Sequence, residues 1–187
     1  MRAETDAGVN AVATTEDAEQ TKRRFRDVMG RFATGVTVIT AESEGRTNGM
    51  TANGFMSVSL EPPLVVISVR CESKMIGSID AAGAYGVSVL AFEQAFLSKH
   101  FAGRPVEGLE EPFIEVDGIP MIVGAIAHIA VKVVDRHVVG DHVLFVGEVT
   151  TADHVTGDPL IFHSGAYHAL SNVEEWTARW NVEGGWW

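Results

Sequence analysis

Cysteine is almost absent from this chain, which has only Cys71 among its 187 residues. A single thiol excludes an internal disulfide framework and any zinc site built from cysteines. Cations are scarce too, since 14 lysines and arginines face 25 acids and give a formal net charge of −11 at pH 7. General binding to nucleic acid or to an anionic membrane needs a basic face, so the charge argues against both classes of partner. A local basic pocket for a phosphate is still permitted.

Long apolar runs are missing as well. The longest one, residues 122–131, is interrupted by Gly124 and His128 and is too short to span a bilayer. The first twenty residues carry five acids and no apolar segment of the kind that forms a signal peptide. We therefore expect a protein that has no membrane segment and resides in the cytoplasm.

The sequence signatures of several enzyme classes are also missing. No G-x-G-x-x-G or G-x-x-x-x-G-K-[ST] occurs, so a dinucleotide would have to bind by other means. There is no G-x-S-x-G nucleophile motif, and the seven histidines include no H-E-x-x-H. The pairs His137/His142 and His163/His168 are separated by turn residues, which is weak evidence for metal ligation. We expect no metal site.

The length of the chain fits one domain with a sizeable core. Residues 1–20 lack periodicity and are interpreted as a flexible tail, residues 21–170 as the domain, and residues 171–187 as a C-terminal extension. Four apolar residues at helical spacing predict an amphipathic helix over residues 22–33, which Gly35 ends. They are Phe25, Val28, Met29 and Phe32.

Most of the remaining chain is predicted to form short strands rich in Val and Ile, separated by Gly, Pro and Asp. These strands are expected at residues 36–40, 50–52, 64–69, 86–90, 128–134, 142–149 and 160–163. Two further helices are expected at residues 73–82, with Ser73 as N-cap, and 91–101, and a brief one after Asn172. Because no regular crossover helices join the strands, we predict a mainly β protein, an antiparallel Greek-key-like barrel with peripheral helices.

Two polar segments stand out. Many short hydroxyl and amide side chains lie beside β-branched ones over residues 35–64, which fits either a solvated hairpin or a site that hydrogen-bonds a flat polar ring. The second segment, Ser68-x-Arg70-x-x-Ser73-Lys74, lies where a strand meets a predicted helix start. Free amides and cations there favour an anion, although a capping serine beside two solvated cations is the alternative.

An ordered series of short motifs connects these segments to the rest of the chain. It includes Phe25-Arg-x-x-Met29-x-x-Phe32-Ala-Thr-Gly-Val-Thr-Val38, Gly49-Met-Thr-Ala-Asn53-x-Phe55-x-Ser-Val-Ser59, Pro62-Pro63-Leu64, Phe101-Ala102, Gly140-Asp141-His142, Gly147-Glu-Val149 and Gly165-x-Tyr167. Over about residues 22–170 this order closely resembles the short-chain flavin reductases, the NAD(P)H-dependent reductase components of two-component monooxygenases.

The resemblance implies an FMN-binding type of split β-barrel that works as a homodimer, with FMN or FAD near the subunit interface. It also implies that NADH or NADPH reduces the flavin, which then leaves for a partner monooxygenase. Phe101 lies in a stretch that is often near the flavin in this family. The residues expected to bind flavin are Thr34, Gly35, Val36, Thr37, Thr51, Ala52, Asn53, Ser57, Ser59, Ser68, Arg70, Ser73, Lys74 and Phe101.

Three residues are expected at the nicotinamide: His142, Asp141 and Tyr167. In similar reductases the histidine of this motif lies close to the nicotinamide, so His142 is the catalytic candidate, for orienting NAD(P)H first and as a proton donor second. A hydrogen-bonded turn histidine is the alternative, and Tyr167 equally fits a buried core position. At the level of function, the alternatives are a split barrel that holds flavin or haem without catalysis, an oxidase of the pyridoxamine-phosphate type, and a transport or interaction protein with no ligand.

Overall fold

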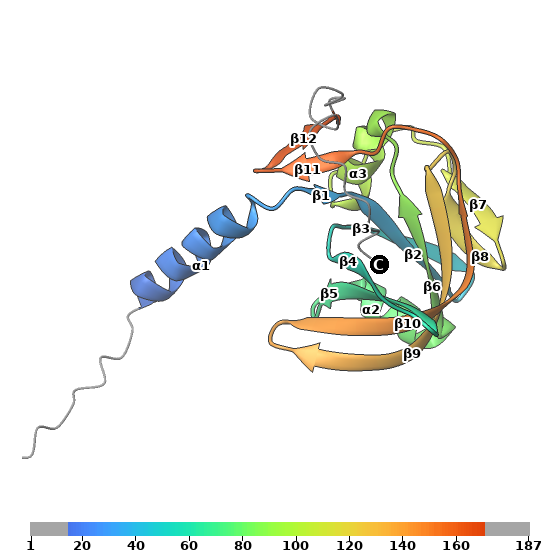
Figure 1. The fold of residues 1–187 in the computed structure, drawn as a ribbon, viewed down its shortest axis with the longest axis horizontal. Coiled ribbons are helices and arrows are strands. Elements are labelled where there is room, and N and C mark those ends of the chain that lie inside the picture. The colour runs from blue at the N-terminus through green and yellow to red at the C-terminus, as the bar shows by residue number, and fades with distance from the viewer. Residues whose placement is uncertain (1–14, 171–187) are drawn as a thin grey trace, which may run out of the picture.

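The structure is a computed structural model that describes residues 15–170. Strands dominate it, and the helices lie around them (Figure 1). The elements are α1 Thr15–Met29, β1 Thr34–Gly35, β2 Thr37–Ser43, β3 Arg46–Ala52, β4 Phe55–Leu60, β5 Pro63–Arg70, α2 Lys74–Ala82, β6 Ala84–Val89, η1 Phe92–Gln94, α3 Ala95–Phe101, β7 Phe113–Val116, β8 Ile119–Ile122, β9 Ala127–Val139, β10 His142–His154, β11 Ile161–His163 and β12 Ala166–His168.

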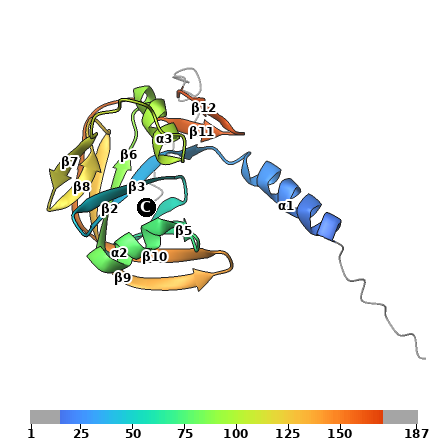
Figure 2. The same cartoon turned by 180° about the vertical axis from the view of Figure 1, so that it is seen from behind.

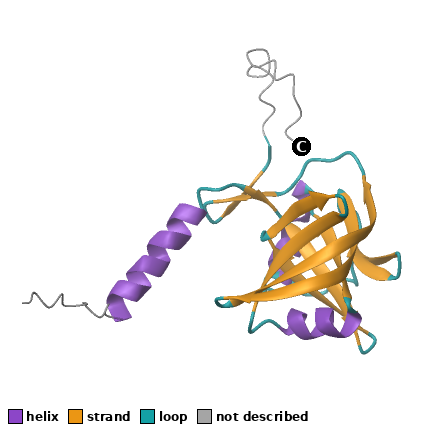
Figure 3. Cartoon of the chain, turned by 60° about the horizontal axis from the view of Figure 1, so that its bottom comes forward, coloured by secondary structure: helices purple, strands orange, loops and turns teal. Residues whose placement is uncertain are grey.

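The main sheet has seven antiparallel strands in the order β3-β2-β6-β9-β10-β5-β4. β3 and β4 lie at its two opposite edges, yet only Asn53 and Gly54 separate them in the chain. The sheet must therefore curl until its edges meet, and it forms the barrel seen in Figure 3. Because β3 and β4 are not paired with each other, the barrel is split between them. The predicted split-barrel architecture is confirmed.

Two smaller sheets complete the fold. β1, β11 and β12 form a three-stranded sheet, and β7 and β8 form a hairpin. The hairpin is held to the barrel by buried polar side chains: Thr40 donates a hydrogen bond to the carbonyl of Pro120, and Ser88 accepts one from the Ile122 amide at 2.9 Å. The three-stranded sheet lies beside α3 at one end of the barrel (Figure 1).

The core consists of two clusters of buried apolar side chains. One fills the barrel and includes Ile39, Ile67, Tyr85, Val131 and Phe145. The other lies under α3 and the small sheet, with Val36, Val38, Leu90, Leu97, Ile122 and Leu160 among its members. Alternate side chains of β5 and β10 point into the barrel, as the period of a half-buried strand requires.

The helices at the barrel surface follow local signals in the sequence. The Ser73 hydroxyl accepts a hydrogen bond from the Met75 amide at 3.3 Å and caps α2, and Gly83 ends α2 in a left-handed conformation with φ of 64°. The segment 91–101 divides into η1 and α3. Both of these predicted helical segments are confirmed.

The first helix differs from its prediction in position and setting. α1 begins at Thr15, within the expected tail, and ends at Met29, whereas residues 22–33 were predicted. Glu16 and Asp17 favour the earlier start because acids stabilise a helix N-terminus. The helix ends before Gly30, well ahead of Gly35. Its side chains from Glu16 to Met29 are all exposed, and it points away from the barrel (Figures 1 and 2).

Several strands are longer or more numerous than predicted. β3 starts at Arg46, four residues before the predicted strand, and β9 and β10 each run for 13 residues. β1, β4, β7, β8 and β12 were not predicted as strands. Residues 1–14, and the C-terminal extension 171–187 with its expected brief helix, lie outside the described residues. Within residues 15–170, no helix has both the length and the apolar character needed to cross a membrane.

Candidate functional site

Two hollows lie side by side where the barrel is split, and both are lined by Asn53, one of the two residues between β3 and β4. The first has a volume of about 290 Å³ and the second about 160 Å³. Together they fall in the range of roughly 300–1,000 Å³ that is usual for small-molecule sites. The first is lined by Phe32, Ala33, Thr34, Gly35, Asn53 and Phe55, the second by Val36, Thr51, Ala52, Asn53, Ser98, Ala102, Phe162 and Tyr167.

Hydrogen bonds between three elements fix the wall of the second hollow. The Thr51 hydroxyl of β3 donates to the carbonyl of Ser98 in α3 at 2.7 Å. The Ser98 hydroxyl shares a hydrogen bond of 2.8 Å with the phenol of Tyr167 in β12. The rings of Phe162 and Tyr167 pack edge to face, with their centroids 5.5 Å apart. The wall is therefore a defined surface, partly aromatic and partly polar.

The first hollow contains a polar group without a partner. The Thr34 hydroxyl oxygen is buried and makes no hydrogen bond within the described part of the chain. Leaving such a group unpaired costs about 1–3 kcal/mol, so it is suited to a ligand that brings the missing partner. Beside it, a Cβ added to Gly35 would meet no atom within 4 Å, which leaves the backbone open to a ligand. These two features fit a flat polar ring such as isoalloxazine, whose pyrimidine edge carries donors and acceptors.

Most of the expected ring-binding residues meet at these hollows. Thr34, Gly35 and Asn53 line the first, and Val36, Thr51, Ala52 and Asn53 the second. Tyr167, expected at the nicotinamide, lines the second hollow with them.

Other expected ring-binding residues line neither hollow. Thr37 is buried and its hydroxyl donates to the carbonyl of Ala52 at 2.7 Å, which ties β2 to the end of β3. Phe101 packs against Gly49, where an added Cβ would lie 2.5 Å from its ring. Ser57 and Ser59 lie on β4, within the hydroxyl-rich segment, but neither serine lines a hollow.

Ser68 connects the split to a basic corner of the molecule. Its amide donates to the carbonyl of Gly54 at 2.9 Å, so it lies against the turn that separates β3 from β4. Arg70 follows two residues later on the same face of β5, and Lys74 is the first residue of α2. Ser73 is the N-cap between them. The cations of the predicted anion-binding segment therefore lie together at the end of β5.

His142 and Asp141 also lie at this corner. His142 is the β10 partner of Arg70, and its Nδ1 lies 2.8 Å from the Asp141 carboxylate. The hydrogen bond and charge of His142, with a smaller effect of Arg70, lower the pKa of Asp141 below its ordinary value. Neither His142 nor Asp141 lines a hollow. Within one chain, the structure thus separates this pair from Tyr167.

Two lining residues, Ser98 and Phe162, were not among the residues singled out from the sequence. Ser98 is an ordinary serine within a predicted helix, and only the packing of α3 against β3 and β12 brings it to the hollow. Phe32, Phe55 and Ala102 belong to the motif series but were not assigned to binding. Their neighbours in the motifs, Thr34, Asn53 and Phe101, were expected to bind flavin, and this adjacency was the signal that could have identified them.

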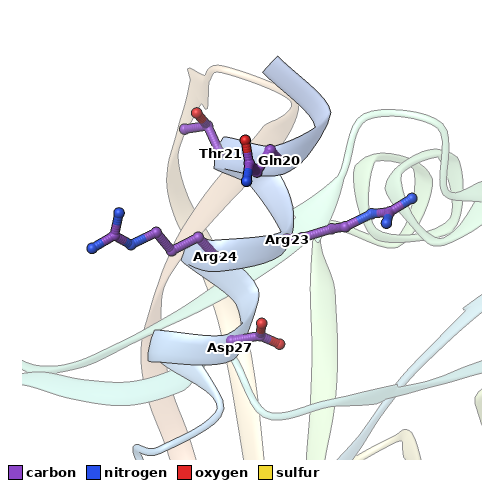
Figure 4. A pocket seen from close by; sticks show the side chains of 5 residues that line it. All are labelled: Gln20, Thr21, Arg23, Arg24 and Asp27. Carbon is purple, nitrogen blue, oxygen red and sulfur yellow. The ribbon is translucent and has the colours of Figure 1, made fainter. Parts of the chain in front are cut away.

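A further hollow of about 450 Å³ lies along α1 (Figure 4). Its lining side chains, Gln20, Thr21, Arg23, Arg24 and Asp27, all come from this one exposed helix and spread away from one another. We assign no site to it. Within residues 15–170, no group of three or more His, Cys, Asp or Glu side chains is placed to hold a metal ion.

Comparisons with known proteins identify relatives of this chain. The sequence pattern of the flavin reductase like domain matches residues 29–171. An NADH-dependent flavin reductase of a Rhodococcus species is 43% identical over 157 residues, which cover 82% of this chain and 89% of the relative. The reductase component of 4-hydroxyphenylacetate 3-monooxygenase from Thermus thermophilus is 39% identical over 152 residues, or 80% of this chain and 97% of the relative.

The fold has close counterparts among solved structures. The flavin reductase of styrene monooxygenase from Pseudomonas putida S12 superposes with a TM-score of 0.74 at 36% identity, covering 79% of this chain and 97% of that one. The matched region contains the barrel, both hollows and the basic corner. On the sequence pattern, the relatives and the fold together, this chain belongs to the flavin reductase-like family.

Proposed function

We propose that this protein is an NAD(P)H:flavin oxidoreductase that supplies reduced FMN or FAD to a partner monooxygenase. The observation that carries the proposal is the pair of hollows at the barrel split, with the unpaired Thr34 hydroxyl beside the open backbone of Gly35. Because the relatives described above include an NADH-dependent enzyme, NADH is the donor we propose. The bound flavin would supply the chemistry by accepting a hydride from the nicotinamide.

The residues of the chain would bind and align the two partners. Thr34, Asn53 and Thr51 offer hydroxyl and amide groups to the polar edge of the ring, and Tyr167 with Phe162 provides an aromatic wall. α3 contributes Ser98 to the lining of the second hollow, and the small sheet contributes Phe162 and Tyr167. Alignment of this kind is the main contribution a protein makes when cofactors carry the reaction.

The basic corner would hold phosphate. Ser68 of β5 is hydrogen-bonded to Gly54 at the split, and β5 runs from there to Arg70, which is followed by Lys74 at the start of α2. A flavin with its ring in the hollows could therefore extend its phosphate toward these two cations. Ser73 already caps α2, so its hydroxyl is partly committed to the helix. We propose Arg70 and Lys74 as the main phosphate contacts, and His142, held by Asp141, as the residue that orients the nicotinamide.

The full chain can be tested with NADH or NADPH and with FMN or FAD, in all four combinations. We expect at least one pair to show consumption of the nicotinamide that depends on both flavin and protein. If no pair is consumed faster with protein than without it, the proposed activity is wrong. If flavin is bound but no nicotinamide is consumed, the chain is a binding module instead.

We also propose that the protein is a homodimer. The apolar side chains Phe25, Val28 and Met29 of α1 are exposed by 64%, 62% and 51% of their surface. A single helix of 15 residues is marginal in water unless an apolar face packs against something. Phe32, which follows α1, lines the first hollow, so a second copy packed here would lie beside the site. We propose the cytoplasm as its location, where reduced nicotinamide is available.

A further inference from the structure

Ser98 is the most deeply buried polar side chain at the hollows, with 1% of its surface exposed. It lies in α3 between Leu97, which belongs to the core, and Lys99, which is exposed. Serine within a helix commonly turns its hydroxyl back to the carbonyl four residues earlier. Here the hydroxyl instead bonds to Tyr167, 69 residues further along the chain.

The Ser98–Tyr167 hydrogen bond joins two separate parts of the fold. Tyr167 lies on β12, in the small sheet β1-β11-β12, which shares no strand with the barrel. Ser98 is itself held to the barrel, because the Thr51 hydroxyl of β3 donates to its carbonyl at 2.7 Å. A chain of polar contacts therefore runs from β3 through α3 to β12, and all three of its residues line the second hollow.

The Tyr167 ring is restrained from its other sides as well. Phe162 packs against it edge to face, and the ammonium of Lys99 lies 5.9 Å from its ring centroid, within the range of a cation–π contact. The Phe162 and Lys99 contacts act on the edge and face of the ring, whereas the hydrogen bond to Ser98 fixes the phenol oxygen at its far end. Without the bond, the ring would be free to swing about its Cα–Cβ bond and carry the phenol out of the wall.

We infer that Ser98 is a positioning residue, which acts through Tyr167 to hold the aromatic wall of the flavin pocket in its binding orientation. The inference rests on the proposed function, since it assigns Ser98 a role at the same site. Its consequence is specific: loss of the bond weakens flavin binding and leaves turnover at saturating flavin almost unchanged.

The test uses Ser98→Ala, Tyr167→Phe and the double variant in the full chain, with direct titration of FMN in the absence of nicotinamide. A tyrosine against the isoalloxazine quenches its fluorescence, so in the unaltered protein and in Ser98→Ala the titration reports both affinity and the position of the ring. In the two variants without Tyr167 it reports affinity alone. We expect each single variant to raise the Kd for FMN by about three- to tenfold, the range for one hydrogen bond. The Kd of the double variant for FMN should not exceed the higher of the two single-variant values, because both substitutions remove the same bond.

Ser78→Ala is the matched control. Ser78 is also a buried helical serine, but its hydroxyl accepts from the Asn48 amide at 2.9 Å and lines neither hollow. We expect a similar small loss of stability and an unchanged Kd for FMN. The KM for flavin should follow the Kd in each variant, while kcat should move less than twofold.

The outcomes separate the inference from the proposed function. If the unaltered protein neither binds nor uses FMN or FAD, the proposed function is wrong and the role of Ser98 is wrong with it. If it binds FMN and both single variants bind equally well, or their effects simply add in the double variant, the positioning role is wrong and the function stands. Should Ser98→Ala fail to fold, Tyr167→Phe removes the same bond from the other side and decides the question.

Discussion

At the scale of single residues, Tyr85 and the basic corner show how burial and charge act in this fold. The ring of Tyr85 is fully buried in the barrel, and its hydroxyl has no hydrogen-bond partner within residues 15–170. Burial raises the pKa of Tyr85 above its ordinary value of about 10. The hydroxyl is thus a cost to the folded state that function does not explain.

Tyr85→Phe should therefore increase stability. Removing a buried, unpaired hydroxyl is expected to raise the free energy of unfolding by about 1 kcal/mol, or the melting temperature by about 2–4 °C. Because the folded pKa is raised, the unaltered protein loses stability as pH rises above about 10, and this loss is absent from the variant. The gain should thus widen at alkaline pH in thermal denaturation. A variant that melts earlier at neutral pH would show that the hydroxyl has a partner.

Arg70 and His142 face each other across β5 and β10 but are proposed to serve different ligands. Arg70→Ala should raise the KM for flavin about tenfold, because a charged contact to phosphate is lost. His142→Ala should raise the KM for the nicotinamide and leave that for flavin nearly unchanged. Steady-state kinetics with each substrate varied makes each variant the control for the other. An unchanged KM for flavin in Arg70→Ala would contradict the role of Arg70. A change in His142→Ala that affects only the KM for flavin would contradict the role of His142.

At the scale of elements, the site depends on close approaches between strands that the sequence pattern does not reveal. β6 passes so near β8 that a Cβ at Gly86 would lie 2.6 Å from the Thr40 hydroxyl, 2.8 Å from the Met121 sulfur and 2.9 Å from the Pro120 carbonyl. Glycine is needed there because of this packing. This contact holds the β7–β8 hairpin against the barrel.

Gly86→Ala should destabilise the protein by about 1–3 kcal/mol through overpacking. Gly77→Ala is the control, because a Cβ at Gly77 in α2 meets no atom within 4 Å and alanine favours a helix by about 0.5–1 kcal/mol. Chemical denaturation should thus move the two variants in opposite directions. Equal stability of Gly86→Ala and the unaltered protein would show that β8 can move away from β6.

The elements also show what could be predicted from the sequence. Among the strands with buried apolar side chains on one face, β10 was predicted with its correct start and β5 to within one residue, because burial imposes a period of two. β4 was not predicted although its apolar side chains at 56, 58 and 60 alternate with serines; these apolar side chains are exposed in one chain, so the alternation does not mark a core face there. Thr34, Gly35 and Asn53 could be assigned through the motif series, whereas Ser98 could not, because only tertiary packing brings α3 to β12.

At the scale of the whole molecule, the exposed apolar surface is the feature that a single chain leaves unexplained. Besides α1, the strand β4 exposes Met56, Val58 and Leu60 by 60%, 52% and 74%. Exposed apolar groups of this size usually mark an interface. The family resemblance implies a homodimer, and we propose that a second copy covers this surface.

Replacing Phe25 and Val28 together by serine should convert a dimer to a monomer. Both side chains are exposed in one chain, so the fold itself should be retained. Arg23→Ser is the control, since two residues of α-helix place Arg23 about 200° away from Phe25. Light scattering on the eluting protein should give twice the chain mass for the unaltered protein and the control, and the chain mass for the double variant. A monomeric unaltered protein would contradict the proposed assembly.

The central claim is that flavin binds with its ring in the two hollows where the barrel is split. The most direct measurement is a crystal structure of the full chain with FMN. We expect the isoalloxazine between Asn53 and Tyr167, with a ring atom hydrogen-bonded to the Thr34 hydroxyl and the phosphate directed toward Arg70. A well-defined flavin bound elsewhere, with Thr34 still unpaired, would contradict this account.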